Sequence, residues 1–192
     1  MKRLWPALLV LTFMISSLAA FSGRTAADTI HSGTVQVGQT VSYTLANGHH
    51  VEVTATSSAA GNAPKGGAMA TTINSSWAEI TYVEYFGCYC VEAWRYTLHT
   101  DFQWDGTYLY SDSERDTLQI SAAGYVNTSR YVGHFTLQSD PNNGWAMINR
   151  SYGHVEMQEW DGPILIATCV VNVYNNVNGN GSSASSWDSN SC

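Results

Sequence analysis

The sequence predicts an all-β protein, built as a single antiparallel β-sandwich or jelly roll. Apolar and polar residues alternate along several stretches, turn residues recur between these stretches, and no stretch has the periodicity of an amphipathic helix. Charged residues make up 12% of the 192 residues, about half their usual share, which argues against a coiled coil or a charged helical bundle. The length fits one domain of ordinary size.

The N-terminal residues 1–27 have the pattern of a secretory signal peptide. Two basic residues precede the largely apolar residues 8–18, and Ala27 ends a run of small residues where a signal peptidase could cut. Ala19 and Ala20 are alternative cleavage points. An uncleaved anchor is a further alternative, but the apolar stretch is short for a bilayer span. We therefore expect a secreted or cell-surface protein with no membrane span after signal cleavage.

A β-hairpin is expected early in the mature chain. Asn47 and Gly48 separate residues 40–46 from residues 49–56, and Asn-Gly is a strong two-residue hairpin signal. The small residues of 57–72 then predict an internal loop before the main sheet.

Residues 94–104 show the alternation of a half-buried strand most clearly. The face expected to be buried carries Trp94, Tyr96, Leu98, Thr100, Phe102 and Trp104, and the solvated face carries Arg95, Thr97, His99, Asp101 and Gln103. Residues 130–138 repeat this pattern. Expected inside are Tyr131, Phe135 and Leu137, and expected outside are His134, Thr136 and Gln138.

Turn residues mark further strand ends. Asp105 and Gly106 separate two β-rich stretches, and residues 141–144 and 161–163 are rich in Pro, Asn, Asp and Gly. Turns that recur after short strands are typical of a sandwich or barrel.

The last predicted strand, residues 164–173, is apolar on both faces, so we place it centrally in its sheet. The predicted β-sandwich domain therefore covers residues 28–174. The Asn/Ser/Gly-rich residues 175–192 are expected to be a flexible C-terminal tail.

The charge balance excludes some classes of partner. The full chain has a formal net charge of −7. Removal of residues 1–27 leaves five basic and fifteen acidic residues, a formal charge of −10. Nucleic-acid binding requires Lys and Arg for phosphate contacts, so we do not expect a nucleic-acid partner.

All four cysteines, Cys88, Cys90, Cys169 and Cys192, lie in the mature chain. An even number in an exported chain suggests two disulfides. A bond between Cys88 and Cys90 would close a small strained ring, so each is expected to pair with Cys169 or Cys192. A zinc site is less favoured, because no second close pair of ligands accompanies Cys88 and Cys90.

Polar side chains on three predicted strands form the first candidate site. They are His99 and Asp101 on one strand, His134 on another, and His154 and Glu156 on a third. If these strands were neighbours, the side chains would converge and could bind a metal or perform acid–base chemistry. An ordinary solvated face is the simpler interpretation, so we expect no metal and no cofactor.

Exposed aromatic residues form the second candidate site. Trp160 shares the face of His154 and Glu156, and Trp145 and Tyr152 lie near Gly-rich turns. A flat ring can pack on the C–H face of a pyranose while neighbouring amides and carboxylates bind its hydroxyls. The alternative is that each ring covers the apolar edge of a neighbour in the core.

Three segments resemble small secreted bacterial proteins of unknown function. They are residues 94–106 (WRYTLHTDFQWDG), 131–135 (YVGHF) and 152–155 (YGHV). In those proteins a Trp-rich strand ends in a Trp-x-Gly-type turn and a Gly-x-Phe strand follows. The resemblance implies export and a β-fold, and it implies no activity.

Residues 83–87 (VEYFG) and 105–110 (DGTYLY) resemble parts of family-eleven xylanases, which are secreted jelly rolls of similar size. The resemblance implies a retaining hydrolase with Glu84 as nucleophile, which needs a second carboxyl group about 5–5.5 Å away. The strand comparable to the one that carries the family's acid/base has no carboxylate here, so Glu156 or Glu159 would have to substitute. A structural ion pair between Glu84 and an arginine is the alternative.

The chain lacks the Gly-x-Ser-x-Gly, His-Glu-x-x-His and P-loop signatures. We favour a secreted, non-catalytic protein that binds a cell-wall or extracellular polysaccharide. One alternative is a secreted glycan hydrolase with paired carboxylates. The other is a secreted antimicrobial or protein-binding effector, for which a large apolar surface patch would be the sign.

Overall fold

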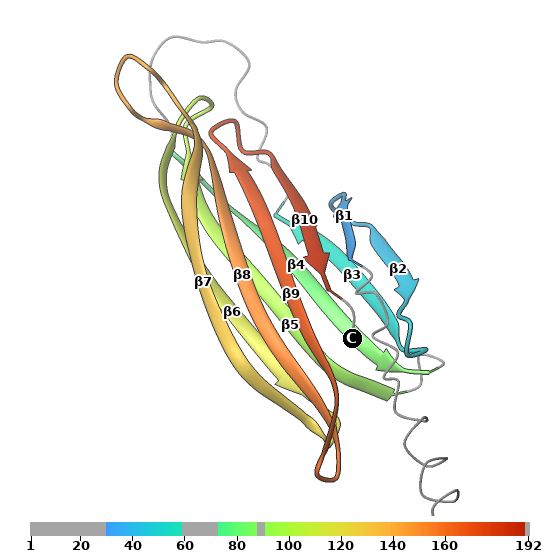
Figure 1. Cartoon of the computed structure of the whole chain (residues 1–192). Coiled ribbons are helices and arrows are strands. Elements are labelled where there is room, and N and C mark those ends of the chain that lie inside the picture. The colour runs from blue at the N-terminus through green and yellow to red at the C-terminus, as the bar shows by residue number, and fades with distance from the viewer. Residues whose placement is uncertain (1–29, 59–72, 88–90, 191–192) are drawn as a thin grey trace, which may run out of the picture.

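The computed structural model describes residues 30–58, 73–87 and 91–190. In these residues the chain forms ten strands, arranged as two five-stranded antiparallel sheets that pack as a β-sandwich (Figure 1). The strands are β1 (His31–Val35), β2 (Thr40–Thr44), β3 (His50–Ser57), β4 (Asn74–Phe86), β5 (Val91–Trp104), β6 (Leu109–Ile120), β7 (Tyr125–Ser139), β8 (Ala146–Asp161), β9 (Ile164–Asn178) and β10 (Ser183–Ser189). The predicted all-β, antiparallel sandwich is confirmed.

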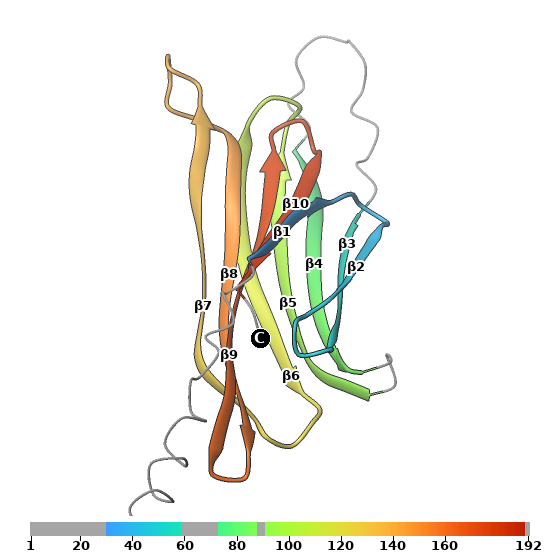
Figure 2. The same ribbon diagram turned by 45° about the vertical axis from the view of Figure 1, so that its right-hand side comes forward.

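Each sheet is mainly a meander, in which neighbours in sequence are neighbours in space. Sheet A has the order β1-β10-β9-β8-β7, and sheet B has the order β2-β3-β4-β5-β6. Figure 2 shows the two sheets as separate layers. Strands β6 and β7, which follow each other in the chain, form an edge of their respective sheets. The turns β5–β6, β7–β8 and β9–β10 therefore lie at one end of the sandwich, and the β8–β9 turn lies at the other (Figure 1).

The core lies between the sheets, and β5 supplies its largest side chains. Every residue predicted to face inward on this strand is buried, with Trp94, Trp104 and Leu98 completely so. Valines of β3, β8 and β9 pack against them: Val51, Val53, Val155, Val171 and Val173. Burial of each aliphatic side chain of this size contributes about 1.5–3 kcal/mol, so this interface is the main source of stability.

The predicted turns are confirmed as strand connections. Gly48 joins β2 to β3 with a φ of 87°, and Gly106 joins β5 to β6 with a φ of 107°. Residues with a side chain rarely adopt such angles, which explains the Asn-Gly and Asp-Gly pairs. The predicted turn at 141–144 lies within the β7–β8 connection, and residues 162–163 of the predicted turn at 161–163 connect β8 to β9.

The predicted orientation of residues 130–138 is wrong. Tyr131, Phe135 and Leu137 are 44–51% exposed on the outer face of sheet A, and His134 points inward to Glu114 of sheet B. The alternation itself is correct, but the space between the sheets is polar at this edge. The polar set of β7 therefore faces inward, and the apolar set faces solvent.

The C-terminal segment 175–192 is not a tail where the structure describes it. Residues 175–178 complete β9, and Ser183–Ser189 form β10 between β9 and β1. Asn175 is completely buried and is bonded to Ser185 and Thr100. Because small polar side chains fill the interior here by hydrogen bonding to each other, the composition resembles that of a linker.

The strand predicted at 164–173 is central, as expected, because β9 is the third of five strands in sheet A. The predicted signal peptide and residues 59–72 of the predicted loop lie outside the described residues. Within the described part of the chain, no helix is long and apolar enough to span a bilayer.

Candidate functional site

The predicted polar site is divided between the two outer faces and the interior. His99 and Asp101 lie on the outer face of sheet B, where the two side chains are 3.1 Å apart. The other nitrogen of His99 bonds to Glu79, and Arg115 forms an ion pair with Asp101. These side chains are therefore bonded to one another. Of them, only Asp101 lines an open, polar hollow of about 350 Å³ on this face.

The outer face of sheet A carries Tyr152, His154 and Glu156 at every second position of β8. This face is on the far side of the sandwich from His99. His154 bonds to Asn172 at 2.8 Å and stacks on Tyr131 with ring centroids 4.5 Å apart. His134 faces the interior, so the three imidazoles do not converge. The metal or acid–base site considered for this set does not form.

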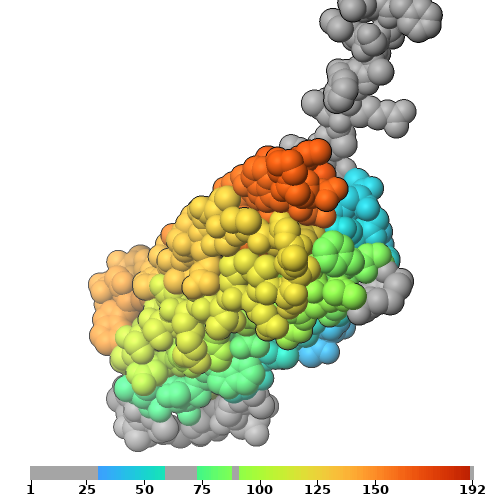
Figure 3. Space-filling model, turned by 90° about the horizontal axis from the view of Figure 1, so that it is seen from below, coloured from blue at the N-terminus to red at the C-terminus, as the bar shows by residue number. Residues whose placement is uncertain are grey.

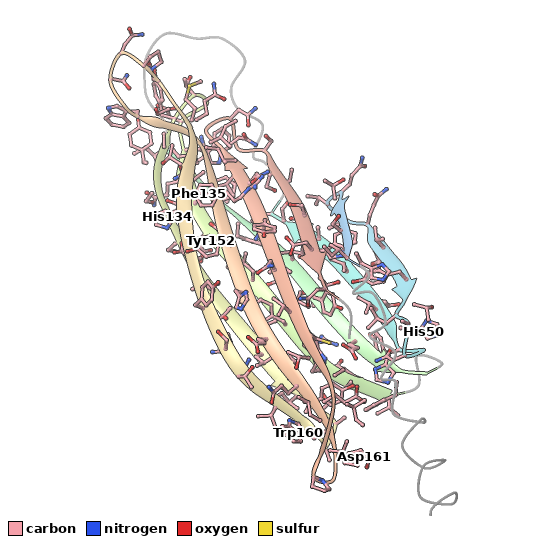
Figure 4. All side chains as sticks on the ribbon, viewed as in Figure 1. His50, His134, Phe135, Tyr152, Trp160 and Asp161 are labelled. Atoms are coloured by element: carbon pink, nitrogen blue, oxygen red, sulfur yellow. The ribbon has the colours of Figure 1, made fainter. Side chains whose placement is uncertain are left out.

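A row of aromatic rings crosses β7 and β8 on the outer face of sheet A. Tyr152 lies 6.2 Å from Tyr131 and 6.1 Å from Phe135 between ring centroids. Figure 4 shows Phe135 and Tyr152 together on this face. Tyr131 and His154 stack on each other, so one face of each ring is covered by protein. This row therefore offers a sugar less free ring surface than the exposed fractions of Tyr131 and Phe135 indicate.

Trp145 lies in an open hollow at the end of the sandwich where the β5–β6 and β7–β8 turns meet. The hollow has a volume of about 320 Å³, and its lining comes from both turns: Asp105, Tyr108, Tyr110, Asn143 and Trp145. The Trp145 ring is 44% exposed. It packs against Tyr110 at 5.0 Å and against Tyr108 at 5.9 Å between centroids. We call this site the Trp145 hollow.

Hydrogen bonds fix the rings of the Trp145 hollow. The Tyr110 hydroxyl donates to Asp105 at 2.8 Å, and the Tyr108 hydroxyl donates to Asp140 at 2.6 Å. Asn143 donates to Asp140 at 3.2 Å and accepts a bond from the Trp145 backbone N–H at 2.9 Å. The side chains are thus held in place before any ligand arrives, which lowers the entropic cost of binding.

The two carboxylates of this network are acceptors that stay ionised in mild acid. Burial alone would raise the pKa of Asp105, but bonds from the Tyr108 amide and the Tyr110 hydroxyl outweigh it and lower the pKa below 3.8. The bond from Tyr108 lowers the pKa of Asp140 as well. The bond to Asp140 raises the pKa of Tyr108, and the bond to Asp105 raises the pKa of Tyr110. Both tyrosine hydroxyls therefore remain protonated donors.

Trp160 lies near the other end of β8, far from the Trp145 hollow (Figure 4). Its indole N–H donates to Gln158 at 3.2 Å. The β8–β9 hairpin beside it is apolar at its tip, where Ile164, Leu165 and Ile166 are 44–62% exposed. Figure 3 views the molecule from this end and shows the hairpin in orange beside the yellow atoms of the β6–β7 region. Trp145 and Trp160 therefore cannot belong to one binding site.

Glu84 is completely buried and accepts three hydrogen bonds. The donors are His49 Nδ1 at 2.7 Å, Trp94 Nε1 at 3.0 Å and the Tyr125 hydroxyl at 3.3 Å. Its partner is thus a histidine and not Arg95 or Arg130, which pair with Glu92 and Asp116.

Glu159 lies beside this buried group, whereas Glu156 lies on the outer face of sheet A. Burial raises the pKa of Glu159, His49 opposes this rise, and the charge of Glu84 adds to it. Of the two carboxylates considered as partners of Glu84, the structure therefore brings only Glu159 near. Glu84 has no exposed surface and its oxygens accept bonds from three side chains, so a substrate could reach it only if these side chains moved.

Cys169 is the one cysteine in the part of the chain that the structure describes. It is buried, it is not a free thiol, and its sulfur lies 3.8 Å from Glu84. Cys88, Cys90 and Cys192 lie outside the described residues. The predicted pairing of Cys169 with one of them stays a prediction.

Comparison with known proteins finds no matching family model, curated protein or solved structure. The two resemblances described above therefore remain predictions. The fold is shown by the structure itself, and function has to be inferred from the chemistry of the sites.

Proposed function

We propose that the protein is a secreted, non-catalytic protein that binds a cell-wall or extracellular glycan, and that the Trp145 hollow is its sugar-binding site. The observation that carries the proposal is a half-exposed indole ring held beside ionised carboxylates and an amide. The ring suits the C–H face of a pyranose. Asp105 and Asn143 line the same hollow and suit the hydroxyls, since each carboxylate oxygen can accept more than one hydrogen bond.

The size and rigidity of the hollow support a small ligand group. Its volume of about 320 Å³ lies at the lower end of the range for small-molecule sites. The hollow is open, so a longer polymer could extend beyond it. The formal charge of the chain favours a neutral polymer over a strongly acidic one.

The test is depletion of the untagged protein from solution by insoluble chitin, cellulose, xylan and peptidoglycan. We expect binding to one polymer and a loss of affinity in Trp145→Ala. A buried or half-buried tryptophan at the centre of an interface contributes about 2 kcal/mol or more, which is roughly 30-fold in affinity. Trp160→Ala is the matched control, because it removes another indole at the opposite end of the sandwich.

Each outcome separates the parts of the proposal. Binding that is lost in Trp160→Ala and kept in Trp145→Ala would move the site to the other end. Absence of binding to all four polymers would contradict glycan recognition. Release of soluble sugar from a polymer would favour the hydrolase, for which the closeness of Glu84 and Glu159 is the supporting observation.

The apolar tip of the β8–β9 hairpin favours a second candidate function, a secreted antimicrobial or protein-binding effector. Three consecutive exposed residues, Ile164, Leu165 and Ile166, are unusual on the surface of a monomer. The test is growth inhibition by the protein and by the double variant Ile164→Ser, Ile166→Ser. This candidate predicts inhibition that the double variant loses, whereas inhibition of equal strength in both proteins would exclude the tip.

A further inference from the structure

We propose that the polar edge between the two sheets is a divalent metal-ion site, with Asp112 and Glu114 of β6 and His134 of β7 as ligands. These strands form the edges of sheets B and A, and their side chains meet across the interior. Figure 4 shows His134 on β7 at this edge. The site is separate from the Trp145 hollow, and the proposal does not depend on glycan binding.

The three side chains lie close to the spacing that one ion requires. One ligand atom of each lies within 4.8 Å of the other two. Two atoms bound to the same Zn²⁺ at about 2.1 Å lie at most about 4.2 Å apart, so small rotations are sufficient to close the site. His134 Nδ1 is 3.0 Å from both oxygens of Glu114.

Buried oxygen atoms without a hydrogen-bond partner lie beside these three side chains and support the metal site independently of their spacing. Among the described residues, four buried side-chain atoms lack a hydrogen-bond partner, and three of them belong to this region: Asp112 Oδ2, Asn149 Oδ1 and Ser151 Oγ. Asn149 is 6% exposed and Ser151 is completely buried. Leaving one such group without a partner costs about 1–3 kcal/mol. A cation would give Asp112 Oδ2 and Asn149 Oδ1, which can only accept, the partner that they lack.

The strand register directs these groups toward the proposed ligands. Asn149 donates from its amide nitrogen to Asp112 at 3.2 Å, so its unpartnered oxygen belongs to a group in contact with the carboxylate. Ser151 is the direct register partner of His134 on the neighbouring strand. Directly opposed residues of an antiparallel pair project to the same face, with Cβ atoms about 4.5–5.5 Å apart. Asn149 can supply a fourth ligand, its carbonyl oxygen.

Positive charge is scarce around these carboxylates. No lysine or arginine of the described residues forms an ion pair with Asp112 or Glu114. Arg115 on the same strand pairs with Asp101 on the outer face, and Arg130 pairs with Asp116 further along β6. Within the described ranges, the basic group in contact with Glu114 is His134, whose ring is an ordinary metal ligand when neutral.

The donor set indicates which ions fit. Two carboxylates, one imidazole and one amide oxygen suit Zn²⁺ or Mn²⁺, because imidazole favours the former and hard oxygen ligands the latter. Ca²⁺ prefers six to eight oxygen ligands and fits less well. The His134 side chain is 45% exposed, so an ion can enter from the edge of the sandwich.

The test is isothermal titration calorimetry of the untagged, metal-stripped protein with ZnCl₂, MnCl₂ and CaCl₂. We expect one-to-one binding of Zn²⁺ or Mn²⁺ and a higher melting temperature in its presence. Glu114→Gln and His134→Asn should weaken binding by at least about tenfold, since loss of an outer-shell partner alone costs about 10- to 100-fold. His31→Asn and Glu52→Gln are matched controls on other strands and should bind like the wild type.

Two results would overturn the proposal. One is the absence of stoichiometric binding of all three ions at millimolar concentration. The other is equal affinity in the wild type, Glu114→Gln and His134→Asn. Circular dichroism of each variant verifies that it is folded. If a variant fails to fold, native mass spectrometry of the wild type with one Zn²⁺ or Mn²⁺, and of Asp112→Asn without it, decides the question.

Discussion

His49 donates a 2.7 Å hydrogen bond to Glu84, and this contact joins the β2–β3 turn to the centre of the core. Glu84 is completely buried, and the His49 side chain is 12% exposed. A buried carboxylate is tolerated only when its oxygens are bonded, and here His49, Trp94 and Tyr125 supply the donors. These three bonds make Glu84 a hydrogen-bonding centre of the core, which is a structural reason for a carboxylate at this position.

The His49–Glu84 contact predicts a pH dependence of stability. The bond to Glu84 raises the pKa of His49 above 6.5, against the opposing effect of burial. A histidine with a raised folded-state pKa stabilises fully below its unfolded pKa, and the contribution is lost as the pH rises through the folded pKa. We expect the melting temperature to fall as the pH rises from about 6.5 into the alkaline range, and to fall less in His49→Gln. Thermal unfolding over this range tests this, and equal slopes in both proteins would contradict it.

Replacing Glu84 should be among the most destabilising single changes. Glu84→Ala leaves the donors of His49 and Trp94 without a buried acceptor, which costs about 3–5 kcal/mol for a broken buried pair. Glu84→Gln keeps the shape and one acceptor, so we expect roughly half that loss. Urea unfolding gives both free energies. Glu52→Ala is the control, because Glu52 is only half-buried and accepts one bond, from Tyr85. A loss in Glu84→Ala no larger than that in Glu52→Ala would contradict the central role of Glu84.

The sequence predicted the sandwich well because the alternation and turn signals are local. The inward residues of β5 and the glycine turns at Gly48 and Gly106 follow directly from strand period and backbone angles. The orientation of β7 could not be predicted, because it depends on whether the facing strand is apolar or polar at that edge. Strand β10 could not be predicted either, because its buried side chains are mostly serines, which give no apolar alternation.

Only part of the Trp145 hollow could be predicted. The position of Trp145 near a Gly-rich turn predicts its role, but nothing local marks Tyr108 and Tyr110 as its neighbours. Local turn residues predict both the β5–β6 and the β7–β8 turn, and an up-and-down meander places these two turns at the same end. The register and the sheet assignment of β6 and β7 were missing, and the polar metal-binding edge needs the same information. Neither is contained in local patterns.

The hydrogen bond from Tyr110 to Asp105 predicts a pKa change in the Trp145 hollow. Tyr110→Phe removes one of the donors that keep the pKa of Asp105 low, while the amide bonds from Thr107 and Tyr108 remain. We expect the pKa of Asp105 to rise toward 3.8 without reaching it. Titration of the carboxyl carbon signal by NMR measures this. An unchanged pKa would show that the bond does not form in solution.

Gly179 links the β9–β10 turn to the β5–β6 turn and to β8, at the end of the sandwich where the Trp145 hollow lies. Its carbonyl accepts a bond from the Gly106 amide at 2.9 Å, and its amide donates to Met147 at 2.8 Å. A Cβ at this position would overlap the backbone of Thr107 and Tyr108. Since backbone cannot move aside like a flexible side chain, Gly179→Ala should displace the β5–β6 turn.

That displacement should affect stability and binding together. We expect Gly179→Ala to lower the free energy of unfolding by about 1–3 kcal/mol, as overpacking does, and to weaken any glycan binding by the Trp145 hollow. Gly162→Ala is the matched control, because its Cβ would meet no atom and its turn lies at the opposite end. Its positive φ of 57° costs about 1–2 kcal/mol on its own, so stability changes in the control while binding does not. Equal effects of both substitutions on binding would mean that the hollow is not positioned by Gly179.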